Sequence, residues 1–454
     1  MQEAFFPIRK QIAYAFGMMG WSIMINLISV ILIYLYVPTS GSGLPLVISQ
    51  VVILGIFNII SIITGGGRLI DAAVDPLIAQ LSDRSHHPKG RRIPLMKKAI
   101  LPSMIFCCLV FCPLRLSVSA LNVAWLAFTL AGFYILSTLY IIPYNALLPE
   151  LAPGSGDKVR LSTLQSVGYV FGIGIASNAF NIADLFQHSF AGLSRLGALQ
   201  YTVFLLALFA ALCMAVTAWS IDERKYATGK PSSVPFRKAL GQTLGNRNFR
   251  FFIVADFSYF IGVTLISSGL LYFVTVLLPL KETIGNKLII TMVLVSFLFY
   301  PLVNFLSARI GKKPIVIVSL LILSGVFAGI YFLGRPALDP ELQIYSLIIV
   351  AAIPVASLNI LPVAILAEII AKDTLETGSN REAMYFAIRY FFVKIAQTFG
   401  IALFAMFLVQ GKDVGHDTGI RMSGVLGFVL CFTAAIIFLG FKEDGKRPEF
   451  TGNP

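Results

Sequence analysis

Residues Arg68–Arg92 read RLIDAAVDPLIAQLSDRSHHPKGRR, and they place two carboxylates in an apolar segment that ends in a basic cluster. Asp71 and Asp75 are four residues apart, so on a helix they share one face, with Cβ atoms about 6 Å apart. Between positions 51 and 81 the only other charge is that of Arg68. An ionised side chain in the middle of a membrane helix costs at least ~2.5 kcal/mol, and such residues usually mark the path of an ion or a solute. The pair therefore predicts a buried cation site.

The composition is typical of an integral membrane protein. Of the 454 residues 57% are hydrophobic and 13% are charged, with a mean hydropathy of +0.83, whereas soluble domains carry about 25% charged residues. Apolar runs of about 20 residues, long enough to cross a bilayer, recur along the chain. We place twelve spans, at 10–36, 46–81, 96–114, 121–148, 160–185, 198–220, 250–280, 285–311, 313–334, 343–371, 383–410 and 421–441. The predicted fold class is an all-α, multi-pass membrane protein with twelve transmembrane helices.

Basic residues gather in alternate loops, which predicts the orientation in the membrane. The loops that follow the spans 46–81, 198–220, 285–311 and 421–441 are rich in Lys and Arg, whereas the loop at 38–46 has none. We therefore expect both termini in the cytoplasm. The same asymmetry, with anionic membrane lipid as the partner, explains the net charge of +13. No nucleic-acid partner is expected.

A short sequence repeat divides the chain into two halves. Pro76–Arg84 reads PLIAQLSDR and Pro301–Arg309 reads PLVNFLSAR, and a glycine and basic residues follow both. A chance match of so short a motif is the alternative. We predict a six-helix bundle with the cation site at 1–221, a cytoplasmic linker at 222–249, a second six-helix bundle at 250–441 and a cytoplasmic tail at 442–454. Two such six-helix pseudo-repeats resemble the major facilitator fold, in which substrate binds between the halves.

Three motifs carry a more specific resemblance. The segment 68–84 is followed by KGRRIP, then by YIIPYNALLPEL at Tyr140–Leu151 and ILAEIIAKDTLETG at Ile365–Gly378. In this the chain resembles the glycoside–pentoside–hexuronide:cation symporters, the melibiose permease group of the major facilitators. The resemblance implies symport of a small organic solute, a sugar or glycoside, with Na⁺ or H⁺ by alternating access, without a cofactor. It also implies a monomer in the bacterial inner (plasma) membrane. A vertebrate branch, the sodium-dependent lysophosphatidylcholine symporter, shares the first motif.

The resemblance implies a cation site at four residues. The family's two carboxylates fall on Asp71 and Asp75, its threonine on Thr138 and its buried lysine on Lys394. An asparagine beside the second acid of melibiose permease is Val74 here, which removes one oxygen ligand. Na⁺ requires hard oxygen ligands, and two carboxylates with a hydroxyl supply them, so the implied metal is Na⁺ at the two acids. The alternative is a structural ion pair of one acid with the lysine or with the arginine of the same span.

The family's sugar site does not map onto this chain. The two acids that bind the galactoside in melibiose permease fall on Ser22 and Ile141, its stacking tryptophan on Asn145 and its arginine on Ser166. Charged acceptors in a dry pocket hold sugar hydroxyls, so the expected cavity is less acidic. This departure makes a lysophospholipid or another amphiphile the alternative solute. The candidate substrate-binding residues are Trp21, which either stacks on a solute ring or anchors its helix, Ser22, Ile141, Asn145, Gln165, Ser166 and Asn359.

Charged residues at the cytoplasmic ends of the spans are candidates for a gate. The family pairs basic residues before the fifth span with acids at the end of the tenth, which matches Lys158 or Arg160 with Glu368 or Asp373. The alternative is a solvated face whose pairs contribute under ~1 kcal/mol each. In the C-terminal half we expect Asp256 and Tyr259 to line the cavity and Arg389 to face the cytoplasmic vestibule. The candidate gate residues are Asp83, Arg84, Lys158, Arg160, Glu368, Asp373 and Arg381, beside the charged Arg91, Arg92 and Glu150.

Two other classes of protein are disfavoured. The sequence contains no HExxH, GxSxG or Walker motif, which are signatures of common hydrolases and nucleotide-using enzymes, so no enzymatic activity is expected. Two acids in one half do not form the ring of charges that lines a channel filter. A transporter is the predicted class.

Overall fold

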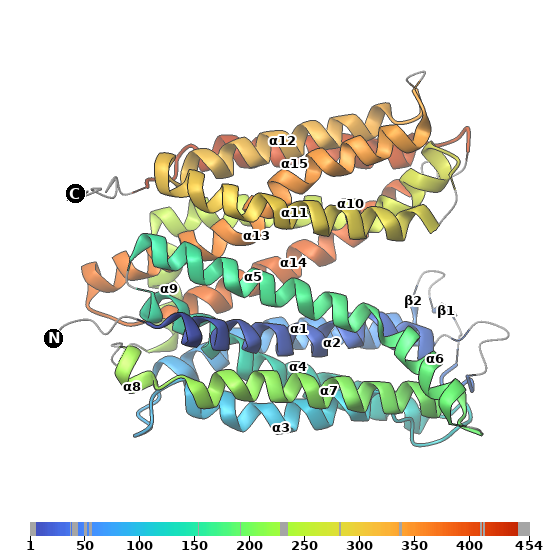
Figure 1. Ribbon diagram of the computed structural model, residues 1–454, viewed down its shortest axis with the longest axis horizontal. Coiled ribbons are helices and arrows are strands. Elements are labelled where there is room, and N and C mark those ends of the chain that lie inside the picture. The colour runs from blue at the N-terminus through green and yellow to red at the C-terminus, as the bar shows by residue number, and fades with distance from the viewer. Residues whose placement is uncertain are drawn as a thin grey trace. The chain divides into compact units, whose positions relative to one another are not determined.

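The computed structural model describes residues 6–36, 38, 44–49, 52–53, 57–152, 154–190, 192–227, 235–280, 283–335, 338–408, 411 and 414–443, and most of them are helical (Figure 1). The helices are α1 (Ile8–Tyr36), α2 (Ile59–Asp83), α3 (Ile93–Val110), α4 (Ala120–Leu151), α5 (Ser155–Ser177), α6 (Ala179–Ser189), α7 (Arg195–Ser220), α8 (Glu223–Tyr226), α9 (Phe236–Gly245), α10 (Arg247–Tyr272), α11 (Thr283–Ile310), α12 (Lys312–Phe332), α13 (Pro340–Thr377), α14 (Glu382–Leu408) and α15 (Thr418–Phe438). A π-helical turn, Phe273–Leu277, continues α10.

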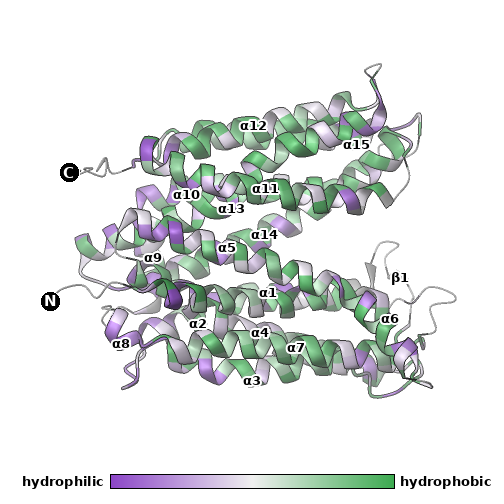
Figure 2. Cartoon of the chain, in the orientation of Figure 1, coloured by the Kyte–Doolittle hydropathy of each residue, from purple (hydrophilic) through white to green (hydrophobic). Residues whose placement is uncertain are grey.

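The predicted spans correspond to helices. Within the described ranges, eleven helices are long and apolar enough to cross a membrane, with α5 and α6 counted as one stretch, Ser155–Ser189. The helix α2 has 25 residues, which is long enough, but Arg68, Asp71 and Asp75 interrupt its apolar character. It supplies the twelfth expected span. Figure 2 shows the same pattern, with hydrophobic residues along the helices and hydrophilic ones mostly near their ends.

The start of the second span differs from the prediction. We expected a helix from 46, whereas α2 begins at Ile59 and is preceded by two short antiparallel strands, β1 (Val52–Ile53) and β2 (Phe57–Asn58). Val52 lies opposite Asn58, and Ile53 lies opposite Phe57. β-Branched and aromatic side chains favour extended backbone, which hydropathy alone does not register. This strand pair is a small exception to the predicted all-α architecture.

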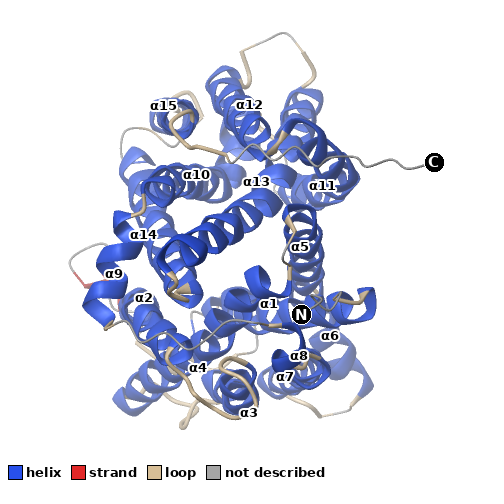
Figure 3. Cartoon of the chain, turned by 90° about the vertical axis from the view of Figure 1, so that its left-hand side faces the viewer, coloured by secondary structure: helices blue, strands red, loops and turns tan. Residues whose placement is uncertain are grey.

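The chain forms two compact units, and each repeats the same helix pairing. In unit 1, α7 packs along α1 and α3, and in unit 2, α15 packs along α10 and α12 (Figures 1 and 3). In each half, therefore, the first and third spans contact the sixth, as an internal repeat predicts. The domain boundaries given above stay a prediction. Unit 1 comprises Met1–Pro153, Thr163–Phe236 and Thr374–Ile388, and unit 2 comprises Gly154–Ser162, Arg237–Asp373 and Arg389–Pro454.

Small residues and buried tyrosines hold the core of unit 1 together. A Cβ added to Gly20 of α1 would lie 2.3 Å from the carbonyl oxygen of Ala210 in α7, so only glycine allows this approach. The rings of Tyr14 and Tyr144 stack 4.3 Å apart. Each hydroxyl donates to the backbone oxygen of the other residue, at 3.0 and 2.8 Å. Close packing of small residues and satisfied polar groups is how membrane helices associate without a hydrophobic driving force between them.

A carboxylate caps the third span of each half in the same way. Glu223, just after α7, accepts hydrogen bonds from the backbone N–H groups of Arg91 (2.7 Å), Arg92 (3.0 Å) and Ile93 (2.9 Å) at the start of α3. Glu443, which follows α15, accepts from the two residues that open α12, at 2.7 and 3.0 Å. An acid at a helix N-terminus satisfies donors that have no partner within the helix and complements its dipole. The caps extend the internal repeat to the level of single contacts.

A glycine with positive φ precedes each capped helix. Gly90 has φ +113° and Gly311 has φ +86°. A Cβ at these positions would meet an oxygen of Glu223 at 2.3 Å and of Glu443 at 2.7 Å, respectively. Both the backbone conformation and the space therefore require glycine.

We predict that Gly90→Ala and Gly311→Ala each destabilise the protein. The expected loss is at least ~1 kcal/mol, because alanine adopts neither this backbone conformation nor the space beside the carboxylate without strain. The measurement is the apparent unfolding temperature in detergent. Gly156→Ala is the control, since nothing lies within 4 Å of its Cβ position and alanine favours a helix. Unchanged unfolding temperatures in both test variants would contradict the caps.

Candidate functional site

The two acids of the opening motif are buried on α2. Asp71 is 5% exposed and Asp75 is not exposed at all, and their spacing of four residues places them on one helix face. Thr138 of α4 is also buried, and its hydroxyl donates a hydrogen bond of 2.6 Å to Asp71 Oδ1. Because α2 packs along α4, the structure brings three of the four predicted cation-site residues to one place.

Arg68, which precedes the two acids on α2, also lies beside α4. The guanidinium of Arg68 is 5.7 Å from the ring centroid of Tyr134, which is one turn before Thr138 on α4. The fourth predicted member of the site, Lys394, is partly buried on α14 and belongs to unit 2. Its predicted place beside the acids stays a prediction. Within the described residues, no group of three or more His, Cys, Asp or Glu side chains is arranged to hold a metal ion. The candidate oxygen set in unit 1 is thus two carboxylates and one hydroxyl.

The predicted substrate residues of unit 1 are buried and hydrogen-bonded to their neighbours. The amide of Gln165 donates to Asn145 Oδ1, and the amide of Asn145 donates to the backbone oxygen of Ile141 at 2.8 Å. Ser22 donates to the backbone oxygen of Tyr169 at 2.7 Å. The remaining member, residue 166, is 9% exposed on α5. Neutral amides and hydroxyls from α1, α4 and α5 therefore stand at the positions of the family's acids, and their role as the lining of a solute cavity stays a prediction.

Trp21 connects this lining to the acids through α4. Its indole N–H donates to Ser137 Oγ at 2.8 Å, and its ring stacks on Tyr169 at 6.3 Å between centroids. Ser137 directly precedes Thr138, which holds Asp71. Adjacent residues of one helix thus contact the predicted solute residue and the predicted cation ligand. Asn359, the candidate from the C-terminal half, is exposed on α13 and hydrogen-bonds Tyr300 within unit 2.

A buried charge cluster joins the ends of four helices in unit 1. Arg92 contacts Glu382 and Glu150, each at 2.9 Å, and lies 3.8 Å from Asp83. Arg91 pairs with Glu150 as well. All five side chains are at most 6% exposed. Burial lowers the pKa of the Arg92 guanidinium, but the surrounding carboxylates raise it by more, so the pKa lies above its usual value and the group stays charged.

Asp83 also fixes the start of α14. Its two carboxylate oxygens accept from the backbone N–H groups of Ala383 and Met384, each at 3.2 Å. Glu382, the first residue of α14, is the member of this cluster that the sequence did not single out. An acid at the start of a long apolar run was the available signal, because acids favour the first turn of a helix.

The other predicted gate residues are spread over both units. Arg84 and Arg160 are exposed, whereas Lys158, Asp373 and Arg381 are buried. Arg381 donates to Thr377 Oγ1 at 3.3 Å. In unit 2, Glu368 forms a 2.7 Å ion pair with Lys312, which also donates to Ser155 Oγ. The family resemblance predicts Lys158 or Arg160 as the partner of Glu368. The structure shows Lys312 as a partner, because this residue begins α12 and its side chain is buried.

A second buried charge pair lies inside unit 2. Arg389 of α14 and Asp256 of α10 are each 5% exposed and form two hydrogen bonds, of 2.8 and 3.1 Å. The guanidinium also lies within 6 Å of the rings of Phe252 and Phe260. The expectation that Arg389 faces the cytoplasmic vestibule is wrong, because the buried carboxylate of Asp256 and these aromatic rings surround it.

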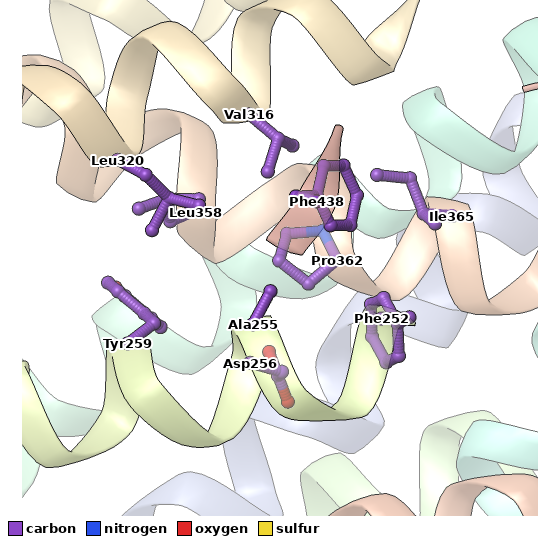
Figure 4. A pocket seen from close by; sticks show the side chains of 10 residues that line it. All are labelled: Phe252, Ala255, Asp256, Tyr259, Val316, Leu320, Leu358, Pro362, Ile365 and Phe438. Carbon is purple, nitrogen blue, oxygen red and sulfur yellow. The ribbon is translucent and has the colours of Figure 1, made fainter. Parts of the chain in front are cut away.

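Asp256 and Tyr259 line a small cavity inside unit 2, shown in Figure 4, and their expected place in the solute cavity stays a prediction. Apolar side chains such as Leu320, Leu358 and Pro362 complete its wall. Its volume of about 20 Å³ matches a single water molecule rather than a solute.

We predict that removing one member of the Asp256–Arg389 pair destabilises unit 2 strongly. Asp256→Leu or Arg389→Met should each cost ~3–5 kcal/mol, because the remaining charge stays buried. The double variant should recover most of the loss, since apolar residues replace both charges. The measurement is a double-mutant cycle of apparent unfolding temperatures. As the control, Asp184→Asn removes an exposed ion pair with Arg195 and should change stability by under ~1 kcal/mol. Losses that simply add in the double variant would refute the pairing.

The helices and their repeated pairing define a polytopic membrane protein, and sequence comparison gives its family. The chain matches the family model described as MFS/sugar transport protein over residues 13–442. It therefore belongs to that family, the melibiose permease-like branch of the major facilitators. The resemblance carried by the three motifs is confirmed.

Named relatives and a solved structure agree with this assignment. The chain is 24% identical to the uncharacterized symporter sll1374 of Synechocystis sp., over 90% of this chain and 87% of the relative. It is 22% identical to the isoprimeverose transporter of Lactiplantibacillus pentosus, over 98% and 90%. The solved proton:xylose symporter XylE, bound to 6-bromo-6-deoxy-D-glucose, matches with a TM-score of 0.67 at 14% identity, over 97% of this chain and 96% of that one. Likeness at this identity shows the major facilitator fold alone.

Proposed function

We propose that the protein is a secondary active transporter that couples Na⁺ or H⁺ to the symport of a sugar or glycoside. The observation that carries the coupling is the pair of acids buried on α2, one of them held by Thr138. Membership of a sugar-transport family supports the solute class. Relatives named as a symporter and as an isoprimeverose transporter support the same reading.

The acids of α2 form the cation site in this proposal. Two carboxylates on one face repel each other when both are ionised, so binding of a cation or a proton relieves the repulsion. The hydroxyl of Thr138 donates a hydrogen bond to Asp71, which orients the carboxylate without neutralising its charge. The two carboxylates and the hydroxyl supply oxygen ligands for Na⁺. A proton would instead bind to either one of the two acids. Lys394 is proposed to compete for the acids and so to help the site release its cation.

Coupling to the solute runs through α4. Thr138 contacts Asp71, and the preceding residue, Ser137, accepts a hydrogen bond from the indole of Trp21. A shift of α4 on cation binding therefore repositions the polar lining formed by Asn145 and Gln165. For symport, the cation must favour the conformation that binds solute well, and the two affinities are linked reciprocally.

The cluster around Arg92 is the proposed cytoplasmic gate. It fastens the first turn of α14 to the ends of α2, α3 and α4 by ion pairs and by the Asp83 cap. Ion pairs that are buried in one conformation and hydrated in the other give a discrete switch. Opening the site to the cytoplasm requires these contacts to break.

We expect gradient-driven uptake to depend on the acids of α2. A thermal-shift screen of sugars, glycosides, nucleosides and lysolipids with and without Na⁺ first identifies the solute, because a true co-substrate stabilises more in the presence of its cation. In proteoliposomes, a Na⁺ or pH gradient should then drive its accumulation. Asp71→Asn and Asp75→Asn should abolish this response, and Thr138→Val should weaken cation affinity by about tenfold or more.

The controls separate the cation site from general damage. Thr138→Ser keeps the hydroxyl and should retain most of the cation affinity, and Asp184→Asn alters an exposed acid on α6. Accumulation that is unaffected in both α2 variants would remove the proposed site. A screen in which only lysolipids stabilise the protein would replace sugar with the amphiphile as the solute.

We expect Arg92→Gln to loosen the gate. The substitution leaves Glu382, Glu150 and Asp83 without their shared guanidinium, so the wild-type closed arrangement loses several charge-assisted bonds. Thiol modification of Ser82→Cys, whose position is fully buried, should accelerate by about tenfold or more. The background is the same variant without Ser82→Cys, because the chain has five cysteines. Arg84→Gln changes an exposed neighbour and should leave the rate of thiol modification unchanged. If Arg92→Gln and Arg84→Gln gave equal rates, the proposed gate would be refuted.

A further inference from the structure

A basic hollow lies at one end of the helices of unit 2. It has a volume of about 640 Å³ and is formed where α10 and α12 begin and α15 ends. Its lining combines three basic residues, Arg247, Lys313 and Lys442, with Glu443 and the apolar Leu439 and Phe441. Neither the cation site nor the proposed gate uses any of these residues.

Among the described residues of the hollow, the one acid is already engaged. Glu443 accepts from the backbone N–H groups of Lys312 and Lys313, at 2.7 and 3.0 Å. Lys313 uses one of its three ammonium donors on the backbone oxygen of Leu439, at 2.7 Å. Arg247 and Lys442 are exposed. The hollow therefore presents three cations against one carboxylate that a helix N-terminus already stabilises, which favours an anion with several acceptor oxygens.

The position and the apolar part of the hollow indicate a lipid as the source of that anion. The hollow lies at the ends of three helices that are long and apolar enough to span a membrane, which is the level of lipid phosphates. Leu439 is 57% exposed beside the basic residues. Arg247 lies over the ring of Phe251, at 5.8 Å, and the same ring abuts Gly440. A free phosphate makes no favourable contact with this apolar surface, whereas the glycerol and the first methylenes of a phospholipid pack against it.

We propose that this hollow binds the headgroup of an anionic phospholipid, with its phosphate between Arg247, Lys313 and Lys442. Basic pockets between membrane helices bind such headgroups. The bound phosphate joins the starts of α10 and α12 to the end of α15, the same three helices whose pairing repeats that of unit 1. Lipid composition thereby sets the stability of unit 2. The inference does not depend on which solute or cation is transported.

The test uses the full chain in detergent, without a transported solute. Short-chain phosphatidylglycerol is titrated, and both the apparent unfolding temperature and the lipid molecules retained in native mass spectrometry are recorded. Phosphatidylglycerol should stabilise the protein more than phosphatidylcholine does, and inorganic phosphate or glycerol phosphate should not reproduce the effect. Arg247→Gln combined with Lys442→Gln should weaken phosphatidylglycerol binding about thirtyfold, as the loss of two charges near the membrane surface implies.

A matched control separates a site from overall charge. Lys89→Gln combined with Arg224→Gln removes two exposed basic residues of unit 1 and should leave phosphatidylglycerol binding unchanged. An equal loss in both double variants would show general attraction to anionic lipid and overturn the proposal. Stabilisation by inorganic phosphate as strong as by phosphatidylglycerol would identify a free-phosphate site instead. Because both test residues are exposed, folding is verified by size-exclusion chromatography, and Lys442→Gln alone should give an intermediate affinity.

Discussion

The structure depends on how it holds charged side chains away from water. Each half contains an ionisable group inside its helices, and the two halves treat it differently. In unit 2, Asp256 meets a guanidinium in two hydrogen bonds, which neutralises its charge and fixes α14 to α10. In unit 1, the hydroxyl of Thr138 orients Asp71 by a hydrogen bond of 2.6 Å. A carboxylate paired with a guanidinium is a structural contact, whereas in the proposed mechanism the acids of α2 bind the exchangeable cation.

The internal repeat is clearer in the contacts between helices than in the amino-acid sequence. Residues 76–84 and 301–309 share only a few positions, yet the sixth span of each half packs on the first and third. The acids Glu223 and Glu443 cap equivalent helices across nearly equal separations, 132 residues to Arg91 and 131 to Lys312. These contacts join the end of each half to the start of its third helix, so they close each bundle at the same place.

Local patterns in the sequence predicted what local physics decides. Hydropathy predicted the membrane spans. The four-residue spacing of Asp71 and Asp75 predicted that the two acids share one face of α2. Hydropathy misplaced the start of α2, because Val52 and Ile53 are as apolar as helix residues but pair as strands. The charge partners were harder to predict. Arg92 and Glu382 are 290 residues apart in the sequence. A periodic pattern within one helix does not indicate which other helix ends it contacts. The same reason explains Arg389, whose burial depends on packing against α10.

The replaced sugar acids have a physical consequence for selectivity. Ser22 and Ile141 carry no charge, and the polar lining of unit 1 consists of the amides of Asn145 and Gln165 with nearby hydroxyls. Neutral acceptors form weaker hydrogen bonds to sugar hydroxyls than carboxylates do. In the proposed transporter, affinity must then come more from apolar and aromatic contact, for which Trp21 and Tyr169 are placed together. A solute that combines a few hydroxyls with an apolar face suits this proposed lining better than a fully hydroxylated hexose. In the same proposal, the acids of α2 serve coupling, and the groups that select the solute lie on other helices.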